Sequence, residues 1–309
     1  MSQQKTVVPV LCNLCGQDDW TVHLPASIED FDALSPDAFR CTSVGYGSHA
    51  QIVKCKTCDY IYANPRWSNE RLIDAYGAVE DATYVVERQG RELTFSKHLQ
   101  AMERYVGEAN GRSLLDVGAY VGIFVDTALK SGWDAMGVEP SSWASAEAKE
   151  EGLPIICGTQ DSPELDGKTF DVITMWDVIE HVDDPSGEMA KAYARLKPGG
   201  WLVVHTMDVD SLAAKLLKAR WPWYMDMHIH YFSQTTMKQM LEKNGFEVKW
   251  SGIQSRYLTL SYLGTRVTAW HEGLGKVASG VINGLGIGKT AVPISFGDLF
   301  TAYAQKPES

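Results

Sequence analysis

The chain has 309 residues, of which 45% are hydrophobic and 22% are charged, so it can form one large globular domain and a smaller module. Its formal net charge of −11 at pH 7 argues against extended contact with the phosphate backbone of a nucleic acid. The chain shows no charged leader followed by an apolar run and no apolar stretch near the roughly 18 residues of a membrane span, so we expect a cytoplasmic protein without membrane contacts.

Residues 1–65 form the first predicted unit, a small module with two C-x-x-C pairs. The stretches CNLCG and CKTCDY each present two thiolates from one tight turn, and together they offer a tetrahedral set of ligands for zinc: Cys12, Cys15, Cys55 and Cys58. Such a site has no open coordination position, so we predict a structural Zn²⁺. Unrelated surface cysteines or a redox pair are the alternatives. Cys41 could replace one ligand, although a buried thiol is expected there.

Residues 66–110 are predicted to form a helical linker or cap. The apolar residues Phe95, Leu99, Met102 and Val106 fall on one face of a helix over 91–109, which ends at the break NGR. This helix precedes the main domain, which we place at 111–309.

From residue 111 onward, strands alternate with helices, a pattern typical of an α/β fold with a parallel sheet covered on both faces. We predict strands at 113–117, 135–139, 154–157, 170–176 and 200–206, with helices at about 122–131, 141–151 and 186–196. A helix at 234–244 then precedes strands at 246–251 and 298–305, which are candidates for an antiparallel edge of the same sheet. The segment between these two strands shows no clear helical pattern. Cys157 ends a strand and is expected in the core.

The stretch LLDVGAYVGIF, residues 114–124, makes the first strand-to-helix turn, where open α/β sheets usually bind a ligand. A dinucleotide fingerprint needs G-x-G-x-x-G, but counting from Gly118 the second and third glycine positions hold Tyr120 and Ile123. The turn reads D-x-G-x-x-x-G instead, with Asp116 before it and Gly122 opening the helix. A carboxylate at this place suits a ligand that carries an ammonium group and no phosphate.

Glu139 ends the next strand, in AMGVEPS, where it could accept hydrogen bonds from both hydroxyls of a ribose. Its spacing from Asp116 alone would also fit NAD. Combined with the altered turn, it favours S-adenosylmethionine, which has an ammonium, a carboxylate, a sulfonium and a ribose diol. The stretch NGLGIGKT resembles a phosphate-binding loop, but it has Asn283 where the first glycine is required and no preceding strand, so we predict a flexible loop.

These motifs, in this order, resemble the class I S-adenosylmethionine-dependent methyltransferases. The match runs through LLDVGAYVGIF, GVEPS, FDVITMWDVIEHVDDP, RLKPGGWLVVHT and HIHYFSQTTMKQMLEKNGF. The resemblance implies a Rossmann-like seven-stranded sheet with an acceptor-side insertion at about 207–297. It further implies that Asp116 and Gly118 hold the methionine moiety and Glu139 the ribose, and that Trp176 and Asp177 line the cofactor near its methyl group.

Tyr120 departs from the family pattern, in which many members have glycine, and this puts in doubt how closely the loop approaches the cofactor. The cysteine module is similar to the zinc-binding modules that precede methyltransferase domains acting on sugars and natural products.

Candidates for the chemistry lie in two histidine stretches. Glu180 and His181 follow the fourth strand in WDVIEHVDDP, and His228 precedes a helix in WYMDMHIHYFS. The resemblance matches both histidines to recurrent positions, and a base with a pKa near 6.5 suits proton removal from a hydroxyl. A structural hydrogen bond is the alternative role for His181, and packing is expected for His230.

An aromatic wall for a ring-shaped acceptor is a further hypothesis, built from Trp221, Trp223 and Tyr224. The expected function is methyl transfer to a small molecule, such as a nucleotide-linked sugar, a glycan precursor or a secondary metabolite. An RNA-modifying methyltransferase that uses the zinc module as a reader is one alternative. A non-catalytic binding or scaffold protein that retains the fold is another. The sequence leaves open whether oxygen, carbon or nitrogen is methylated.

Overall fold

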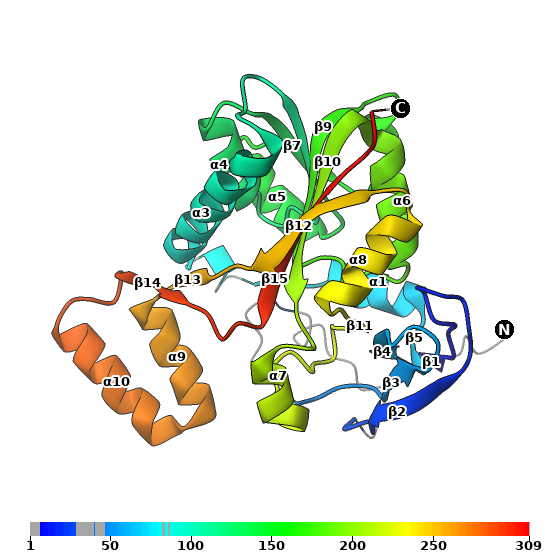
Figure 1. The fold of residues 1–309 in the computed structure, drawn as a ribbon. Coiled ribbons are helices and arrows are strands. Elements are labelled where there is room, and N and C mark those ends of the chain that lie inside the picture. The colour runs from blue at the N-terminus through cyan, green and yellow to red at the C-terminus, as the bar shows by residue number, and fades with distance from the viewer. Residues whose placement is uncertain (1–6, 29–39, 41–46, 82–83, 86, 309) are drawn as a thin grey trace, which may run out of the picture.

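The computed structural model describes residues 7–28, 40, 47–81, 84–85 and 87–308. Its central element is a seven-stranded sheet with the strand order β12-β15-β10-β9-β6-β7-β8 (Figure 1). The strands are β6 (Ser113–Val117), β7 (Asp134–Glu139), β8 (Ile155–Cys157), β9 (Phe170–Trp176), β10 (Leu196–Met207), β12 (Glu247–Ile253) and β15 (Leu299–Gln305). β15 pairs antiparallel with both β10 and β12, and the other pairs are parallel. The predicted α/β sheet with an antiparallel edge is therefore confirmed.

The strand order of this sheet indicates where a ligand site is expected. The chain runs from β6 outward through β7 to β8, then returns to β9 on the other side of β6 and continues to β10. The order therefore reverses between β6 and β9, and in open α/β sheets a crevice opens at such a point beyond the carboxyl ends of the strands.

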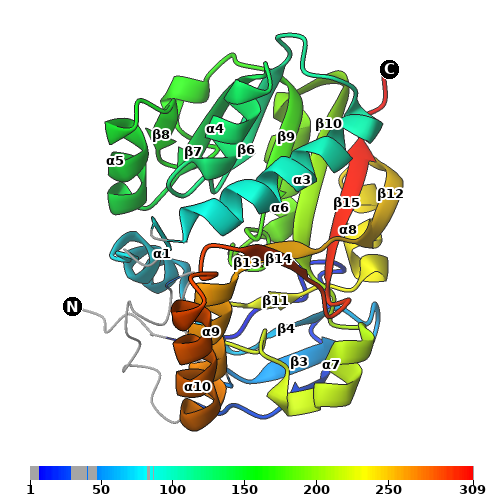
Figure 2. The same cartoon turned by 90° about the vertical axis from the view of Figure 1, so that its left-hand side faces the viewer.

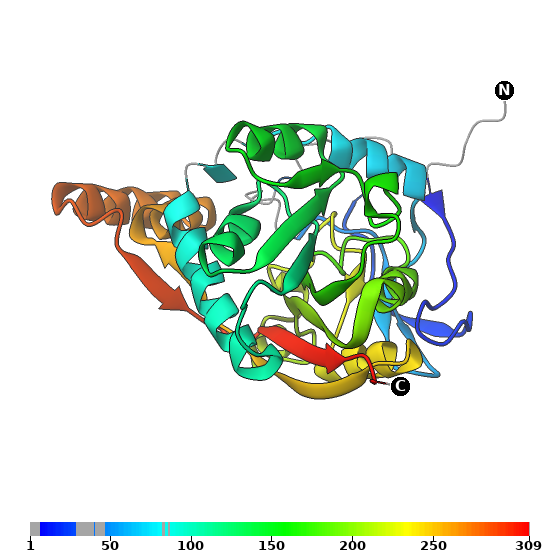
Figure 3. The same ribbon diagram turned by 90° about the horizontal axis from the view of Figure 1, so that it is seen from above.

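Helices cover both faces of this sheet, as Figure 3 shows from above. They are α3 (Arg88–Val106), α4 (Ile123–Lys130) and α5 (Ser142–Glu150), and, on the other face, α6 (Pro185–Arg195) and α8 (Gln234–Lys243). Successive strand residues point to opposite faces. Leu114 thus joins the core beneath α3 and α4, whereas Leu115 joins the core that contains α6 and α8. The near-continuous apolar strands of the sequence reflect this burial on both sides.

The N-terminal module is a second, four-stranded sheet in the order β11-β4-β3-β2. Its strands are β2 (Trp20–Leu24), β3 (Ile52–Cys55), β4 (Ile61–Ala63) and β11 (His230–Tyr231). The short strands β1 (Val7–Val8) and β5 (Arg66–Trp67) pair beside it, and α1 (Asn69–Gly77) follows. Because β11 comes from the far part of the chain, the module and the segment after β10 share one hydrogen-bonded sheet.

Two helices fill the segment in which the sequence showed no helical pattern. They are α9 (Leu260–Trp270) and α10 (Glu272–Gly284), held on the short sheet of β13 (Arg256–Thr259) and β14 (Ala291–Ile294). Figure 2 shows this sheet next to α3, and the helical hairpin beyond it. The expectation was wrong because the glycines of EGLGKVASGVING obscure the helical spacing of Leu274, Val277 and Val281, whose side chains are exposed.

The predicted insertion at 207–297 contains both sheet and non-sheet elements. β12 belongs to the sheet and α8 packs on it. The other elements lie outside the sheet: α7 (Leu212–Leu217), the short helix η4 (Lys218–Arg220), β11 and the α9–α10 hairpin. The segments outside the sheet are therefore 208–233 and 254–298. Among the described residues, no helix has the length and apolar character needed to cross a membrane.

Candidate functional site

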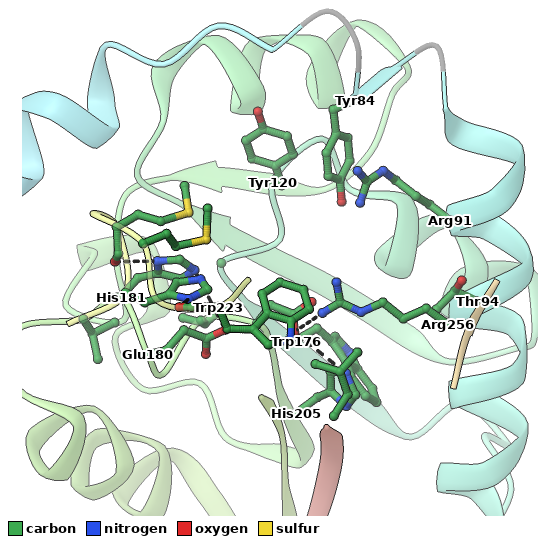
Figure 4. A pocket seen from close by; sticks show the side chains of 18 of the residues that line it. Tyr84, Arg91, Thr94, Tyr120, Trp176, Glu180, His181, His205, Trp223 and Arg256 are labelled. Carbon is green, nitrogen blue, oxygen red and sulfur yellow. Dashed lines mark hydrogen bonds and ion pairs between the residues drawn. The ribbon is translucent and has the colours of Figure 1, made fainter. Parts of the chain in front are cut away.

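A cavity of about 1050 Å³ lies at the point where the strand order reverses. It is lined by the turn after β6, the ends of β9 and β10, the cap helix α3, and the segments 222–228 and 256–267. Figure 4 shows side chains from these elements around it. The cavity is large enough for a nucleoside-containing cofactor and an acceptor side by side.

Asp116 is the last residue but one of β6 and faces this cavity with a buried carboxyl group. Its Oδ1 accepts a hydrogen bond of 2.6 Å from Thr174 Oγ1 on the neighbouring strand. Among the described residues, no ion pair involving Asp116 occurs, and burial raises its pKa to about 8. A cationic ligand group would relieve the cost of ionising this carboxyl group.

The turn that follows has the left-handed backbone for which its glycines are needed. Gly118 has a φ of +71°, and a Cβ there would lie 2.5 Å from Val178 Cγ2. Gly122, at the start of α4, has a φ of +76°, and a Cβ there would lie 2.7 Å from Leu153 Cδ1. Both glycines therefore allow close packing of the turn, and Gly118 also lines the cavity.

Tyr120 also has a left-handed backbone, with a φ of 50°. Its amide donates to Glu139 Oε2 at 2.9 Å, and the other carboxylate oxygen accepts from the amide of Ser141 at 2.7 Å. Burial raises the pKa of Glu139 to about 7. Glu139 lies behind the cavity wall, which Val138 and Pro140 form on either side of it. The Tyr120 ring packs edge-on against Tyr84 from the cap segment, with centroids 4.4 Å apart.

A polar cluster surrounds Trp176, at the end of β9. It combines Trp176 and Asp177, which the resemblance implied at the cofactor, with three residues that were not predicted as site residues. The Trp176 ring lies tilted against those of His98 of α3 and His205 of β10, with ring centroids 5.1 and 5.8 Å away. Three of their buried nitrogens have no hydrogen-bond partner among the described residues: Trp176 Nε1, His98 Nδ1 and His205 Nε2. Asp177, with a φ of 55°, accepts from Arg256 Nη2 at 2.5 Å. All five residues line the cavity.

Glu180, His181 and His228, which are candidates from two separate stretches of the sequence, meet in the structure. Glu180 is buried, and its Oε2 accepts from Thr206 Oγ1 at 2.9 Å. Burial, and then the Asp177 carboxylate, raise its pKa to about 8. The ring centroids of His181 and His228 lie 4.7 Å apart. Burial lowers the pKa of His181 and brings that of His228 well below its usual range.

The predicted aromatic wall is reduced to one residue, because only Trp223 of the three lines the cavity. Its ring stacks on His228 with centroids 6.0 Å apart. Trp221 and Tyr224 are buried away from the cavity. The indole N–H groups of both tryptophans donate to Asp298 Oδ2, at 3.0 and 2.9 Å, which fixes the position of Trp223.

His230 has the packing role that was expected of it. Its Nδ1 lies 2.9 Å from the Tyr60 hydroxyl, and its Nε2 lies 2.9 Å from Arg66 Nη1. Arg66 in turn donates to Asp183 Oδ1 at 2.5 Å, two residues after His181. These contacts connect the N-terminal module with the segment that carries Glu180 and His181.

The four predicted zinc ligands converge, and their Sγ atoms all lie within 4.8 Å of one another. Cys12 and Cys58 are 3.5 Å apart, as are Cys15 and Cys55. Zinc bound tetrahedrally at about 2.3 Å from each sulfur would separate the sulfurs by about 3.8 Å, so the cluster fits this ion. Cys41 lies outside the described residues. Cys157 ends β8 as predicted, but it is exposed, so its expected place in the core was wrong.

Four of the residues described above line the cavity but were not predicted from the sequence: His98, His205, Arg256 and Tyr84. The sequence gives only weak indications for two of them. His205 stands in the otherwise apolar run WLVVHT, and His98 lies one turn from Phe95 on the helix face that was predicted to be buried. A histidine among buried positions often marks a polar pocket. Arg256 and Tyr84 gave no signal, because only the folded chain brings β13 and the cap segment to the cavity.

Comparison with known proteins gives a family match. A family described as "Methyltransferase domain" matches residues 87–249. The chain is 33% identical over 114 residues to the ubiquinone biosynthesis O-methyltransferase of Methylococcus capsulatus, covering 35% of this chain and 48% of that protein. The enzyme of the same name from Paramagnetospirillum magneticum is 30% identical over 119 residues, which cover 37% of this chain and 48% of that protein. The chain spans about half the length of these curated relatives.

Among solved structures, the chain is similar to an S-adenosylmethionine-dependent methyltransferase from Archaeoglobus fulgidus. The identity is 18% and the TM-score 0.49, with 73% of this chain and 100% of that chain covered. A possible histamine N-methyltransferase from Thermotoga maritima gives 21% identity and a TM-score of 0.47, with 74% and 93% covered.

Proposed function

Because the chain belongs to the methyltransferase-domain family, we propose that it transfers a methyl group from S-adenosylmethionine to a hydroxyl group of a small molecule. The observation that carries the proposal is the buried Asp116 carboxyl group, which faces a large cavity without a cation among the described residues. The ammonium group of the cofactor would supply that cation.

The residues around the turn fit the rest of the cofactor. Asp116 and the Gly118 turn would hold the methionine moiety, and Trp176 and Asp177 would line the methyl end. Glu139 would accept from the ribose hydroxyls, which requires Tyr120 and its amide to move or to share the carboxylate. Gly122 would serve through the packing of α4 rather than by contact. When bound, S-adenosylmethionine supplies an electrophilic methyl group on a sulfonium.

His228 is suited to take the proton from the acceptor. Its Nδ1 lies 2.8 Å from the carbonyl oxygen of Trp223, and because a carbonyl can only accept, Nδ1 carries the hydrogen. Nε2 therefore keeps its lone pair. The lowered pKa keeps the imidazole neutral at pH 7, which leaves it able to accept a proton. His181 has the same arrangement, with Nδ1 bonded to the carbonyl oxygen of Met227 at 2.9 Å.

The acceptor we propose is a secondary metabolite with a flat apolar ring. Apolar and aromatic side chains in the cavity lining support it: Trp223, Met225, Met227, Leu258 and Leu263. The names of the curated relatives support a hydroxyl group as the site of methylation.

For the N-terminal module we propose a structural zinc ion held by Cys12, Cys15, Cys55 and Cys58. The sulfur spacing supports it, and all four positions would be filled by protein. The ion would keep β3 and the first cysteine turn together. Through β4 and β11, it would also support the segment that carries His228.

Calorimetric titration with S-adenosylmethionine, and separately with NADH, is the first test. We expect binding of the first and none of the second, with binding weakened in Asp116→Asn. Binding of NADH alone would refute the proposal.

The second test follows methyl transfer from labelled S-adenosylmethionine to a panel of phenols and nucleotide sugars. His228→Ala should lower turnover about a hundredfold or more while cofactor affinity changes less than about twofold. The matched control is His23→Ala on β2, an exposed histidine that does not line the cavity, which should leave both unchanged. Equal turnover in the two variants would remove His228 from the mechanism.

A further inference from the structure

The side chains of Glu180, His181 and His228 bring three metal-ligating atoms together. One atom from each residue lies within 4.8 Å of the others. His181 Nε2 and Glu180 Oε1 are 3.9 Å apart. Two of the residues follow β9 and the third precedes β11, so the fold, rather than local sequence, creates the cluster. Figure 4 shows Glu180 and His181 beside Trp223, away from Tyr84 and Tyr120.

Both histidines are held in the way that metal ligands are held. Each Nδ1–H donates to a backbone carbonyl, that of Met227 for His181 and that of Trp223 for His228. A second hydrogen bond of this kind fixes the ring and the tautomer and directs the Nε2 lone pair at the ion. Both Nε2 atoms are thus ready to ligate without losing a proton.

Glu180 is fixed in the same manner. Oε2 accepts from Thr206, which leaves Oε1 directed toward His181. Its backbone carbonyl accepts from the amides of Ile229 and His230, at 3.0 and 3.2 Å, and so joins the two segments of the cluster. The ligands therefore need little rearrangement to bind an ion.

The negative charge of the Glu180 carboxylate is also not balanced by an ion pair with a lysine or arginine among the described residues. Glu180 is almost completely buried, and among the described residues no lysine or arginine lies within ion-pair distance of it. The guanidinium of Arg256, whose charge also acts on Glu180, is bound to Asp177. A buried carboxylate without a cation is costly, so this site would gain from a divalent ion.

We propose that Glu180, His181 and His228 bind one divalent first-row transition-metal ion on the acceptor side of the cavity. Two imidazoles and one carboxylate leave coordination positions open, in contrast to the closed four-cysteine cluster. Resting on the proposed function, the inference assigns those open positions to an oxygen of the acceptor. It favours acceptors that can offer two neighbouring oxygen atoms, since such a chelate would fill two open positions.

With an ion bound, Nε2 of His228 would hold the metal and could not also take the proton, so His228 would act through the ion. The ion would lower the pKa of the bound hydroxyl group, and the proton would pass to water.

Electron paramagnetic resonance with Mn²⁺ tests the inference on the full, zinc-loaded chain. Mn²⁺ is the probe because thiolates bind it poorly, so the cysteine cluster should not compete. We expect one Mn²⁺ bound per chain. His228→Gln and Glu180→Gln should each weaken binding about tenfold or more. The control variant His23→Gln, which changes an exposed histidine outside the cavity, should bind Mn²⁺ as tightly as the wild type does. Calorimetry with S-adenosylmethionine checks that each variant is folded.

The outcomes separate this inference from the proposed function. Absence of Mn²⁺ binding, or equal binding in folded His228→Gln, overturns the metal site. Methyl transfer at the full rate after removal of every metal ion except the cysteine-bound zinc also overturns the metal site. The methyltransferase proposal then stands. Mn²⁺ binding that depends on His228, in a protein that transfers no methyl group, supports the metal site and refutes the function instead.

Discussion

Replacing Asp116 by asparagine should make the ligand-free protein more stable and increasingly so as the pH rises. The pKa of this carboxyl group is about 8 in the folded chain, against 3.8 for an ordinary aspartate. Between these values the folded chain holds a proton that the unfolded chain has lost. The unfolded state binds fewer protons, so stability falls with rising pH over this window.

The size of this change in stability follows from the pKa shift of Asp116. Each pH unit within the window costs about 1.4 kcal/mol, so the wild type should lose roughly 4 kcal/mol of this contribution between pH 5 and pH 8. Asparagine has no proton to lose and can still accept the hydrogen bond from Thr174. The stability difference between the variant and the wild type should therefore grow by up to about 4 kcal/mol over that range.

Urea unfolding at pH 5, 6, 7 and 8, on zinc-loaded protein without cofactor, measures this difference. Asp171→Asn is the matched control. Burial acts to raise the pKa of Asp171, but hydrogen bonds from Lys197 and Ser113 outweigh it and lower the pKa. This carboxylate therefore stabilises the fold above its unfolded pKa, and its loss should destabilise the protein at neutral pH. A stability difference for Asp116→Asn that does not change with pH would refute the reasoning.

The same variant should bind S-adenosylmethionine about tenfold to a hundredfold more weakly, as expected for loss of a hydrogen bond to a charged group. A more stable protein with weaker cofactor binding would identify Asp116 as a residue retained for function at the expense of stability. Calorimetry at pH 8 measures the affinity, and unchanged binding would contradict the role proposed for Asp116.

Three further changes have defined outcomes. Gly118→Ala should lower stability by about 1–3 kcal/mol, because the new Cβ would lie 2.5 Å from Val178 Cγ2 on a left-handed backbone; thermal unfolding measures it, and no loss would mean that the turn relaxes freely. Cys58→Ser should lower zinc content and melting temperature together, as metal analysis and calorimetry would show; full zinc content would contradict the four-cysteine site. Asp298→Asn retains one acceptor for two indole donors and should cost about 1–3 kcal/mol, with a shift of tryptophan fluorescence as the check.

The sequence predicted the sheet well because its strands are apolar on both faces and its helices have clear periods. It also predicted the position of Asp116, since the carboxyl end of the first strand is fixed by the strand itself. It could not predict that Glu139 is covered by the Tyr120 amide, because that depends on the local path of the turn. Nor could it predict His205 or Arg256 at the cavity, since both arrive there through long-range pairing of strands.

The pairing of β11 with β4 has a consequence for how this protein can diversify. His230 of β11 and Tyr60, the residue before β4, are 170 positions apart in the chain, yet their side chains share a hydrogen bond. A recombination event that exchanged residues 1–65 alone would introduce a sheet whose outer strand belongs to another protein. The unit that can be inherited intact is therefore discontinuous: it comprises the cysteine module together with residues 208–233. Hybrids that exchange both stretches should fold better than hybrids that exchange either one.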